Sequence, residues 1–280
     1  MITVPDVMHR EFPELRELND NSEFQRKEEI LSKSLSRAIK IFTNAPIIKN
    51  KISKFYNIEE QKIIIINHRP SMSVENFTQP DKEILNKIKL DYSLPTNYIF
   101  YPSMYLPHKN HKTIIDVLAN LKINYKKTYQ VVFCGNDLGY LRNIIKYSKQ
   151  KDVYEQIKFL NFVEDSVLPY LYYESNLVLM THISGPTMIP PWEAFKMHKP
   201  VIFPEIEGIQ EVLGDAVIYA NPFNIEIITT SLIKVYEDKN LRNTLIEKGY
   251  QKYNEIKKNK EFKKVLTELD NFFKIEFLGQ

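Results

Sequence analysis

The sequence predicts an α/β protein with two parallel-sheet domains, the first of them incomplete, and three observations support this expectation. From residue 97 onward, short apolar segments alternate with amphipathic segments. The apolar segments lack polar residues at alternate positions, which is typical of strands buried on both faces of a sheet. A shorter set of the same segments occupies the first 90 residues. Parallel sheets bind ligands at the carboxyl ends of their strands, so the informative loops follow residues 101, 134, 160 and 180.

The larger domain is expected over residues 91–255. Its predicted strands are Tyr98–Tyr101, Tyr129–Cys134, Ile157–Leu160, Leu177–Met180, Pro200–Phe203 and Val217–Tyr219. Helices are predicted at His111–Leu121, Leu138–Ser148 and Ser166–Tyr172, from Pro190 onward, and over 224–236 and 239–251. Pro190 and Pro191 suit a helix start because proline is tolerated in the first turn. Trp192 and Cys134 are expected to pack in the core.

The first domain, residues 1–90, is short for a doubly wound unit. Its predicted elements are a helix over Ser22–Ala38, a strand at Ile39–Phe42, a helix from Asn44 to about Phe55 and a strand at Ile63–Ile66. Ser22 and Gln25 fit a capping box. The segment Pro70–Leu94 contains three prolines and is predicted to be a linker. A last amphipathic helix is expected at Glu261–Phe273, within the final segment 256–280.

Composition excludes several classes of protein. The chain has 280 residues, 43% of them hydrophobic, which excludes global disorder, and no apolar run is long enough to span a membrane. A single cysteine excludes a disulfide framework and suits a reducing cytoplasm, and no signal peptide is expected at Met1–Pro13. The net charge of +3 is too small to indicate a nucleic-acid partner. Gly-rich phosphate loops, Asp-x-Asp and His-Glu-x-x-His are absent.

Lys109 lies where a predicted strand passes through a loop into a predicted helix. A helix N-terminus offers unpaired N–H groups and a partial positive charge, so an adjacent lysine makes a site for a diphosphate. The alternative is that Lys109 and Lys112 are solvated surface charges.

Glu193 lies near the start of the helix that begins at Pro190. A carboxylate there can accept two hydrogen bonds from a vicinal diol such as that of a ribose. The alternative is that the carboxylate only complements the positive end of the helix. His9 follows a possible strand end and is either a cleft residue or an ordinary loop histidine.

These segments together resemble the nucleotide-sugar glycosyltransferases of family 4, which have the two-domain GT-B fold. The resemblance to the donor domain covers roughly residues 97–251, with its motifs in the family's order: Phe100-Tyr-Pro-Ser, Pro107-His-Lys-Asn-His, Val131-Val-Phe-Cys-Gly135, Ile157-Lys-Phe-Leu-Asn-Phe-Val163, Gly185-Pro-Thr-Met-Ile-Pro-Pro-Trp-Glu-Ala-Phe and Lys199-Pro-Val-Ile202. In the first domain, Pro5-Asp-Val-Met-His resembles the acceptor-side His-Asp-x-x-His loop.

The resemblance implies a role for each matching residue. Lys109 would neutralise the donor diphosphate and Glu193 would hold the ribose. Phe162 and Val163 would pack near the base, and Gly135 would shape the turn beside the donor. Further members would lie near the phosphates and the sugar, namely Gly185, Pro186 and Thr187. His9 and Asp6 would face the reacting sugar, and the last helix would return to the first domain. Such enzymes retain the anomeric configuration and need no metal.

Three positions depart from the family pattern. Gly185 replaces the first glutamate of Glu-x7-Glu, Met104 stands where an arginine is common, and Pro5 stands where the first histidine of the acceptor loop is expected. The strands that begin the family's first domain also have no counterpart, which suggests a truncated product, a misplaced start or one half of a split enzyme.

The expected function is therefore transfer of a hexose, with mannose one candidate, from a UDP- or GDP-linked donor to a saccharide hydroxyl in surface polysaccharide or lipopolysaccharide synthesis. The acceptor is expected to be a saccharide or lipid-linked, so contact with the inner face of the membrane is an option. One alternative is a catalytically dead nucleotide-binding remnant, and another is a nucleotide-sugar epimerase of similar architecture.

Overall fold

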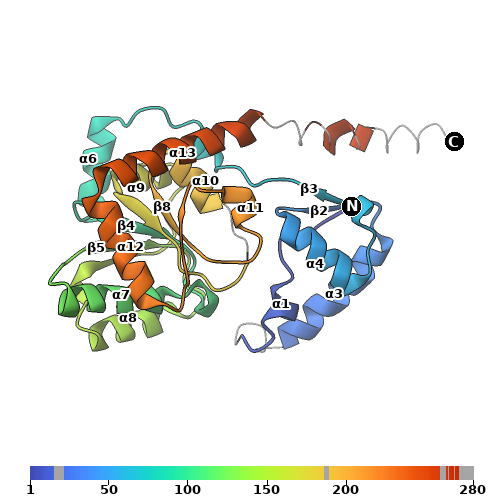
Figure 1. Ribbon diagram of the computed structural model, residues 1–280, viewed down its shortest axis with the longest axis horizontal. Coiled ribbons are helices and arrows are strands. Elements are labelled where there is room, and N and C mark those ends of the chain that lie inside the picture. Colours follow the sequence, from blue (N-terminus) through green and yellow to red (C-terminus); the bar gives the residue numbers. More distant parts are fainter. Residues whose placement is uncertain (16–21, 186–188, 259–262, 264, 268, 271–280) are drawn as a thin grey trace.

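The computed structural model describes the chain except residues 16–21, 186–188, 259–262, 264, 268 and 271–280. It has a smaller N-terminal lobe and a larger lobe, joined by an extended segment (Figure 1). Both lobes are layered α/β units with parallel sheets, as the uninterrupted apolar segments predicted. No helix among the described residues is both long and apolar enough to cross a membrane.

The smaller lobe has a three-stranded parallel sheet in the order β1-β2-β3. Its elements are β1 (Ile2–Thr3), α1 (Met8–Glu11), α3 (Glu23–Arg37), β2 (Ile41–Thr43), α4 (Pro46–Tyr56), a 3-10 turn (Glu60–Lys62) and β3 (Ile63–Ile65). The capping box predicted at Ser22 is wrong. Ser22 has a left-handed backbone, with φ of 59°, and its side chain makes no capping hydrogen bond.

The predicted linker is mostly helical and belongs to the larger lobe. It contains α5 (Met72–Glu75) and α6 (Lys82–Asp91). The Asp81 carboxylate caps α6 by accepting hydrogen bonds from the backbone N–H groups of Glu83 and Ile84, at 2.8 and 3.1 Å. Leu85 and Ile88 then fall on one helix face and join the larger core. Val74 of α5 packs in the same core, so both helices of this segment contact the larger lobe.

The larger lobe contains a six-stranded parallel sheet in the order β6-β5-β4-β7-β8-β9. Its strands are β4 (Tyr98–Pro102), β5 (Gln130–Cys134), β6 (Ile157–Leu160), β7 (Leu177–Leu179), β8 (Val201–Pro204) and β9 (Ile218–Ala220). Its helices are α7 (His111–Asn124), α8 (Leu141–Gln150), α9 (Leu168–Glu174), α10 (Ile189–Lys196), α11 (Gln210–Leu213), α12 (Ile225–Glu237) and α13 (Lys239–Lys258). The first strand, β4, lies at the centre, so the strand order reverses between β4 and β7.

Helices cover both faces of this sheet. Helix α7 packs against α8 and α12, whereas α10 packs against α13 and α5. Trp192 is fully buried and Cys134 nearly so, which confirms their predicted core positions. Helix α13 runs along the larger lobe toward the smaller one (Figure 1). The predicted helix Glu261–Phe273 falls largely outside the described residues.

Candidate functional site

Two loops meet where the strand order reverses. One follows β4 and includes a short 3-10 turn at Pro107–Lys109, and the other follows β7 and reaches Gly185. At such a reversal, the two connections leave toward opposite faces of the sheet and leave a crevice between them. The reversal therefore places the Lys109 loop beside the Gly185 loop, as the sequence predicted.

Backbone and side-chain hydrogen bonds join these two loops. The backbone N–H of Ile183 donates to the carbonyl of His108 at 2.9 Å. The Asn110 amide donates to the carbonyls of Thr181 and Pro222 at 3.1 and 3.3 Å, and the Thr181 hydroxyl donates to the Asn110 carbonyl at 3.1 Å. Asn110 holds a left-handed conformation, with φ of 56°, which asparagine tolerates. Sequence reasoning missed this role, because its partners lie more than 70 residues away.

Lys109 is buried at this junction, with only 7% of its surface exposed. The hydroxyl of Tyr101, in β4, donates to the Lys109 carbonyl and fixes the loop backbone. Burial lowers the pKa of the Lys109 ammonium, and the negative charge of Asp6 opposes that shift. Asp6 belongs to the smaller lobe, so the structure brings together two predicted catalytic residues from opposite lobes.

Two histidines near Lys109, His111 and His182, are fully buried. Ser184, in the loop after β7, is also buried, and its hydroxyl has no hydrogen-bond partner among the residues that the structure describes. Burial lowers the pKa of His111 to about 3 and holds that of His182 well below its usual range, so both rings are neutral and carry an N–H donor. A backbone hydrogen bond at Ser103 partly opposes this shift for His111, and one at Gly185 does so for His182.

Two predicted donor-site glycines have different environments. Gly185 has φ of +80°, and an added Cβ would meet none of the described residues within 4 Å. An added Cβ on Gly135 would lie 2.3 Å from the carbonyl oxygen of Ser103, so this glycine lets the β5 turn pack against the loop after β4. Pro186 and Thr187 lie outside the described residues.

The predicted base contacts separate into one exposed and one buried residue. Phe162 follows β6 and is 67% exposed, so its ring is available to stack on a ligand. Val163 is buried and belongs to the larger core. Contact of either residue with a base stays a prediction.

Glu193 lies in a different setting from the one expected for a ribose ligand. Its side chain is nearly fully buried in α10. One carboxylate oxygen accepts from the backbone N–H and the hydroxyl of Ser71, at 3.1 and 2.6 Å. The other accepts from the Tyr172 hydroxyl at 2.7 Å. Ser71 lies 122 residues away in sequence, so no local pattern revealed it. The carboxylate fastens the segment between the lobes to the larger lobe, and its ribose role stays a prediction.

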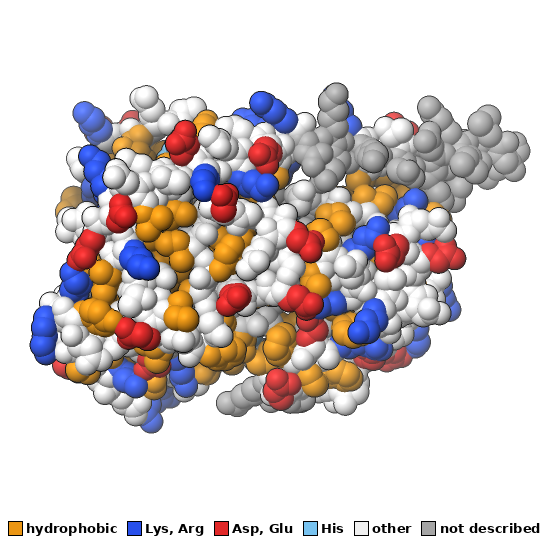
Figure 2. Space-filling view, viewed as in Figure 1, with side chains coloured by type: hydrophobic (Ala, Val, Ile, Leu, Met, Phe, Trp, Pro, Cys, Tyr) orange, Lys and Arg blue, Asp and Glu red, His pale blue; other side chains and the backbone are white. Residues whose placement is uncertain are grey.

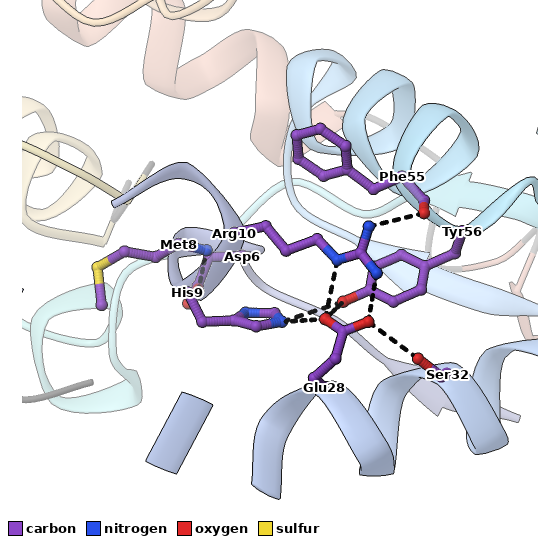
Figure 3. Close-up of polar contacts among 8 residues, drawn as sticks. All are labelled: Asp6, Met8, His9, Arg10, Glu28, Ser32, Phe55 and Tyr56. Atoms are coloured by element: carbon purple, nitrogen blue, oxygen red, sulfur yellow. Dashed lines mark hydrogen bonds and ion pairs between the residues drawn. The ribbon is translucent and has the colours of Figure 1, made fainter. Parts of the chain in front are cut away.

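His9 is buried in the smaller lobe, and its ring points toward Glu28 and Tyr56 (Figure 3). Its Nε2 atom lies 3.2 Å from a Glu28 carboxylate oxygen and 3.0 Å from the Tyr56 hydroxyl. Arg10 binds the same carboxylate and donates to the carbonyl of Phe55 at 2.9 Å. Burial lowers the pKa of His9, against the effect of Glu28. The charge of Asp6 acts on both His9 and Lys109, and contact of His9 with the reacting sugar stays a prediction.

Comparisons with known proteins agree with this arrangement. The family model described as glycosyl transferases group 1 matches residues 85–252. O-antigen chain mannosyltransferase RfbU of Salmonella typhimurium is 25% identical over 69% of this chain and 50% of its own length. O-antigen chain mannosyltransferase B of Escherichia coli is 22% identical over 79% of this chain and 58% of its own. The chain thus spans about half the length of these relatives.

Solved structures share the fold. HepE of Anabaena, in complex with UDP and glucose, superimposes with a TM-score of 0.75 at 15% identity, over 95% of this chain and 71% of that one. WaaG, a glycosyltransferase involved in lipopolysaccharide biosynthesis, gives 0.64 at 17% identity, over 77% and 58%. The two-lobed fold is therefore GT-B, and because the family match covers more than half of the sequence, the chain belongs to the group 1 glycosyl transferases.

Proposed function

We propose that this chain transfers a hexose from a nucleotide-sugar donor to a saccharide hydroxyl during synthesis of a surface polysaccharide or lipopolysaccharide. One observation carries the proposal above the others: a buried lysine at the strand-order reversal, with a carboxylate of the opposite lobe close enough to perturb its pKa. Sugar transfer from a nucleoside diphosphate needs a positive group at the leaving diphosphate and a negative group near the sugar.

Lys109 would neutralise the charge that the diphosphate gains as the glycosidic bond breaks. Because the lysine is buried, its charge acts through a less polar medium than water and stabilises the leaving group more strongly. The Tyr101 hydroxyl and the backbone N–H of Ile183 hold the Lys109 loop in place at the strand-order reversal. These groups support leaving-group stabilisation by a lysine, which is why we propose transfer without a metal.

Asp6 would act on the other side of the breaking bond. Its Oδ1 accepts from the Met8 backbone N–H at 3.0 Å, which fixes the side chain at the start of α1. Sugar transfer passes through an oxocarbenium-like state, whose positive charge a nearby carboxylate stabilises. We propose this role for Asp6, together with retention of the anomeric configuration. His9 would support the lobe that positions Asp6.

The donor is proposed from the relatives. RfbU and mannosyltransferase B are named as O-antigen mannosyltransferases, which favours mannose as the transferred sugar. HepE has been solved with UDP-glucose, which keeps a UDP-linked donor open. A saccharide acceptor, free or lipid-linked, would enter between the lobes, and a lipid-linked one would bring the chain to the membrane surface.

A second candidate function is nucleotide binding without transfer. It is favoured by the contacts of His9, whose Nε2 atom is engaged by Glu28 and Tyr56 of the smaller lobe. Gly185 and Pro5 also lack the functional groups that the family pattern carries at those positions. Such a chain would bind nucleotide at Lys109 and release no product.

Turnover of the purified chain tests the proposed function. With GDP-mannose and UDP-glucose offered separately, one should release its nucleotide, and NMR of the product should show the donor's anomeric configuration. Lys109→Ala should lower turnover about 100-fold or more, the cost of removing one main stabiliser of developing charge. Lys112→Ala is the matched control, because Lys112 lies over the rings of Tyr140 and Tyr147. Undiminished turnover by Lys109→Ala would overturn the assignment.

A further inference from the structure

A cavity of about 280 Å³ lies between the lobes, next to Gly185. The smaller lobe contributes the end of α1 and the first turns of α4, and the larger lobe contributes the loops after β7, β8 and β9. Its size is near the lower end of ligand pockets, so it has room for one sugar ring rather than a nucleotide. The two lobes touch at its edge, where an added Cβ on Gly208 would lie 2.6 Å from the Cβ of Ile47.

The cavity wall combines aromatic rings with carboxylates. Phe12 and Phe223 line it, and Phe223 is 75% exposed. The Asn221 side chain accepts from the Phe223 backbone N–H at 2.9 Å, and this turn holds the ring away from the core. Exposed aromatic rings of this kind offer a face to the C–H groups of a sugar. Acidic side chains gather along the seam between the lobes, above a hydrophobic patch (Figure 2).

The charges in this cavity differ in sign from those around Lys109. Glu11, Glu205 and Glu207 line the cavity, against a single lysine, Lys51. Lys51 pairs with Glu11 of its own lobe and lies 3.6 Å from Glu207 of the other lobe. Glu205 has no such pair among the residues that the structure describes. This excess of carboxylate repels phosphate and favours the hydroxyl groups of a neutral sugar, which donate to carboxylates.

One buried polar group supplies independent support. Ser184 lines the cavity and is only 1% exposed, yet its hydroxyl has no hydrogen-bond partner among the described residues. A buried hydroxyl in that state is satisfied when a ligand atom binds it. Ser184 directly precedes Gly185, so it stands between the Lys109 junction and the cavity.

We propose that this cavity binds the terminal ring of a neutral hexose acceptor, stacked on Phe223 and hydrogen-bonded by Glu205, Glu207 and Ser184. This inference rests on the proposed function. The cleft would then have a basic site at Lys109 for the donor and an acidic pocket for the acceptor. This pocket also restricts the acceptor, since a sugar that carries a carboxylate or a phosphate on this ring would be repelled.

Binding of simple glycosides to the full chain tests the proposal. The probes are methyl β-D-glucopyranoside, methyl α-D-mannopyranoside and methyl β-D-glucopyranosiduronate, titrated by NMR with ligand-observed saturation transfer. At least one neutral glycoside should bind, with the glucuronide about 5-fold weaker or more. Phe223→Ala should weaken neutral binding about 5-fold, and Phe223→Tyr should restore it. Leu90→Ala, an exposed apolar change on α6, is the control.

A second variant tests the charge separately. Glu207→Gln should bind the glucuronide more tightly than the unmodified chain does, because it removes one repelling carboxylate. Unchanged neutral binding in Phe223→Ala, or equal binding of glucoside and glucuronide, would overturn the proposal. Titrations of the same variants with UDP and GDP distinguish failure of the acceptor pocket from failure of the proposed function. Nucleotide binding that persists while the glycoside predictions fail would overturn the acceptor pocket alone, whereas absent nucleotide binding would count against the proposed function itself.

Discussion

The carboxylate of Glu193 joins segments that lie far apart in sequence. It accepts three hydrogen bonds, two from Ser71 and one from Tyr172. If the side chain were removed, the Tyr172 hydroxyl and the Ser71 backbone N–H would lose this acceptor, whereas the Ser71 hydroxyl would keep its contact with the Ser73 hydroxyl at 3.2 Å. A buried carboxylate in this state contributes to stability mainly through the cost of breaking its contacts. Glu193 is therefore expected to contribute mainly to the free energy of unfolding.

Glu193→Ala should lower the free energy of unfolding by about 3 kcal/mol, because it strands buried donors, while Ser71→Ala should cost about 1 kcal/mol. Urea denaturation followed by circular dichroism measures both. Glu193→Gln is the sharper variant, since it keeps the shape of the side chain and one acceptor oxygen. If Glu193→Gln kept full stability and lost nucleotide affinity, the carboxylate would bind ribose instead of fastening the segment between the lobes.

The smaller lobe depends on one carboxylate between three helices. Glu28 of α3 meets Arg10 and His9 of α1 and Tyr56 of α4 (Figure 3). Hydrogen bonding to Arg10 holds the pKa of Glu28 at about 2, against an ordinary value of 4.5. The folded state therefore binds fewer protons than the unfolded chain across this interval. The resulting stability is complete above about pH 4.5 and is lost as the pH falls toward 2.

Glu28→Gln should remove this pH dependence, which is worth about 2 kcal/mol once solvent screening of the partly exposed pair is allowed for. The measurement is the free energy of unfolding between pH 5 and the lowest pH at which the chain stays folded. Glu29→Gln is the matched control, because Glu29 is exposed and pairs only with Lys33 of the same helix among the residues that the structure describes. An identical pH profile for Glu28→Gln and the unmodified chain would contradict the role of the cluster.

Among the helices and strands, the sequence predicted those that depend on strong local patterns. Apolar strands such as Ile157–Leu160 and the proline-initiated α10 were found because burial on both faces leaves a continuous signal. Helix α6 was missed because prolines at 80 and 95 suggested a linker, although its apolar residues have helical spacing. Strand β1 has only two residues and carries too little pattern to be assigned.

At the scale of the whole molecule, the location of the site could be predicted from the sheet topology, but the set of residues that form it could not. Strand order placed the Lys109 and Gly185 loops together, because parallel strands bind ligands at one edge. By contrast, Asn110 takes part through hydrogen bonds to Thr181 and Pro222, and a single sequence does not display contacts between such distant segments. The same holds for Asp6, which reaches Lys109 only because the two lobes face each other.

The central claim is that Lys109 binds the diphosphate of a nucleotide between two lobes. Calorimetric titration of the full chain with UDP, GDP, uridine and guanosine tests it most directly, alongside Lys109→Ala and Lys112→Ala. One diphosphate should bind more tightly than its nucleoside, and Lys109→Ala should lose at least about 10-fold in affinity, as expected for a buried charge-assisted contact, while Lys112→Ala binds normally. Equal affinity for nucleoside and diphosphate, or full affinity in Lys109→Ala, would contradict it.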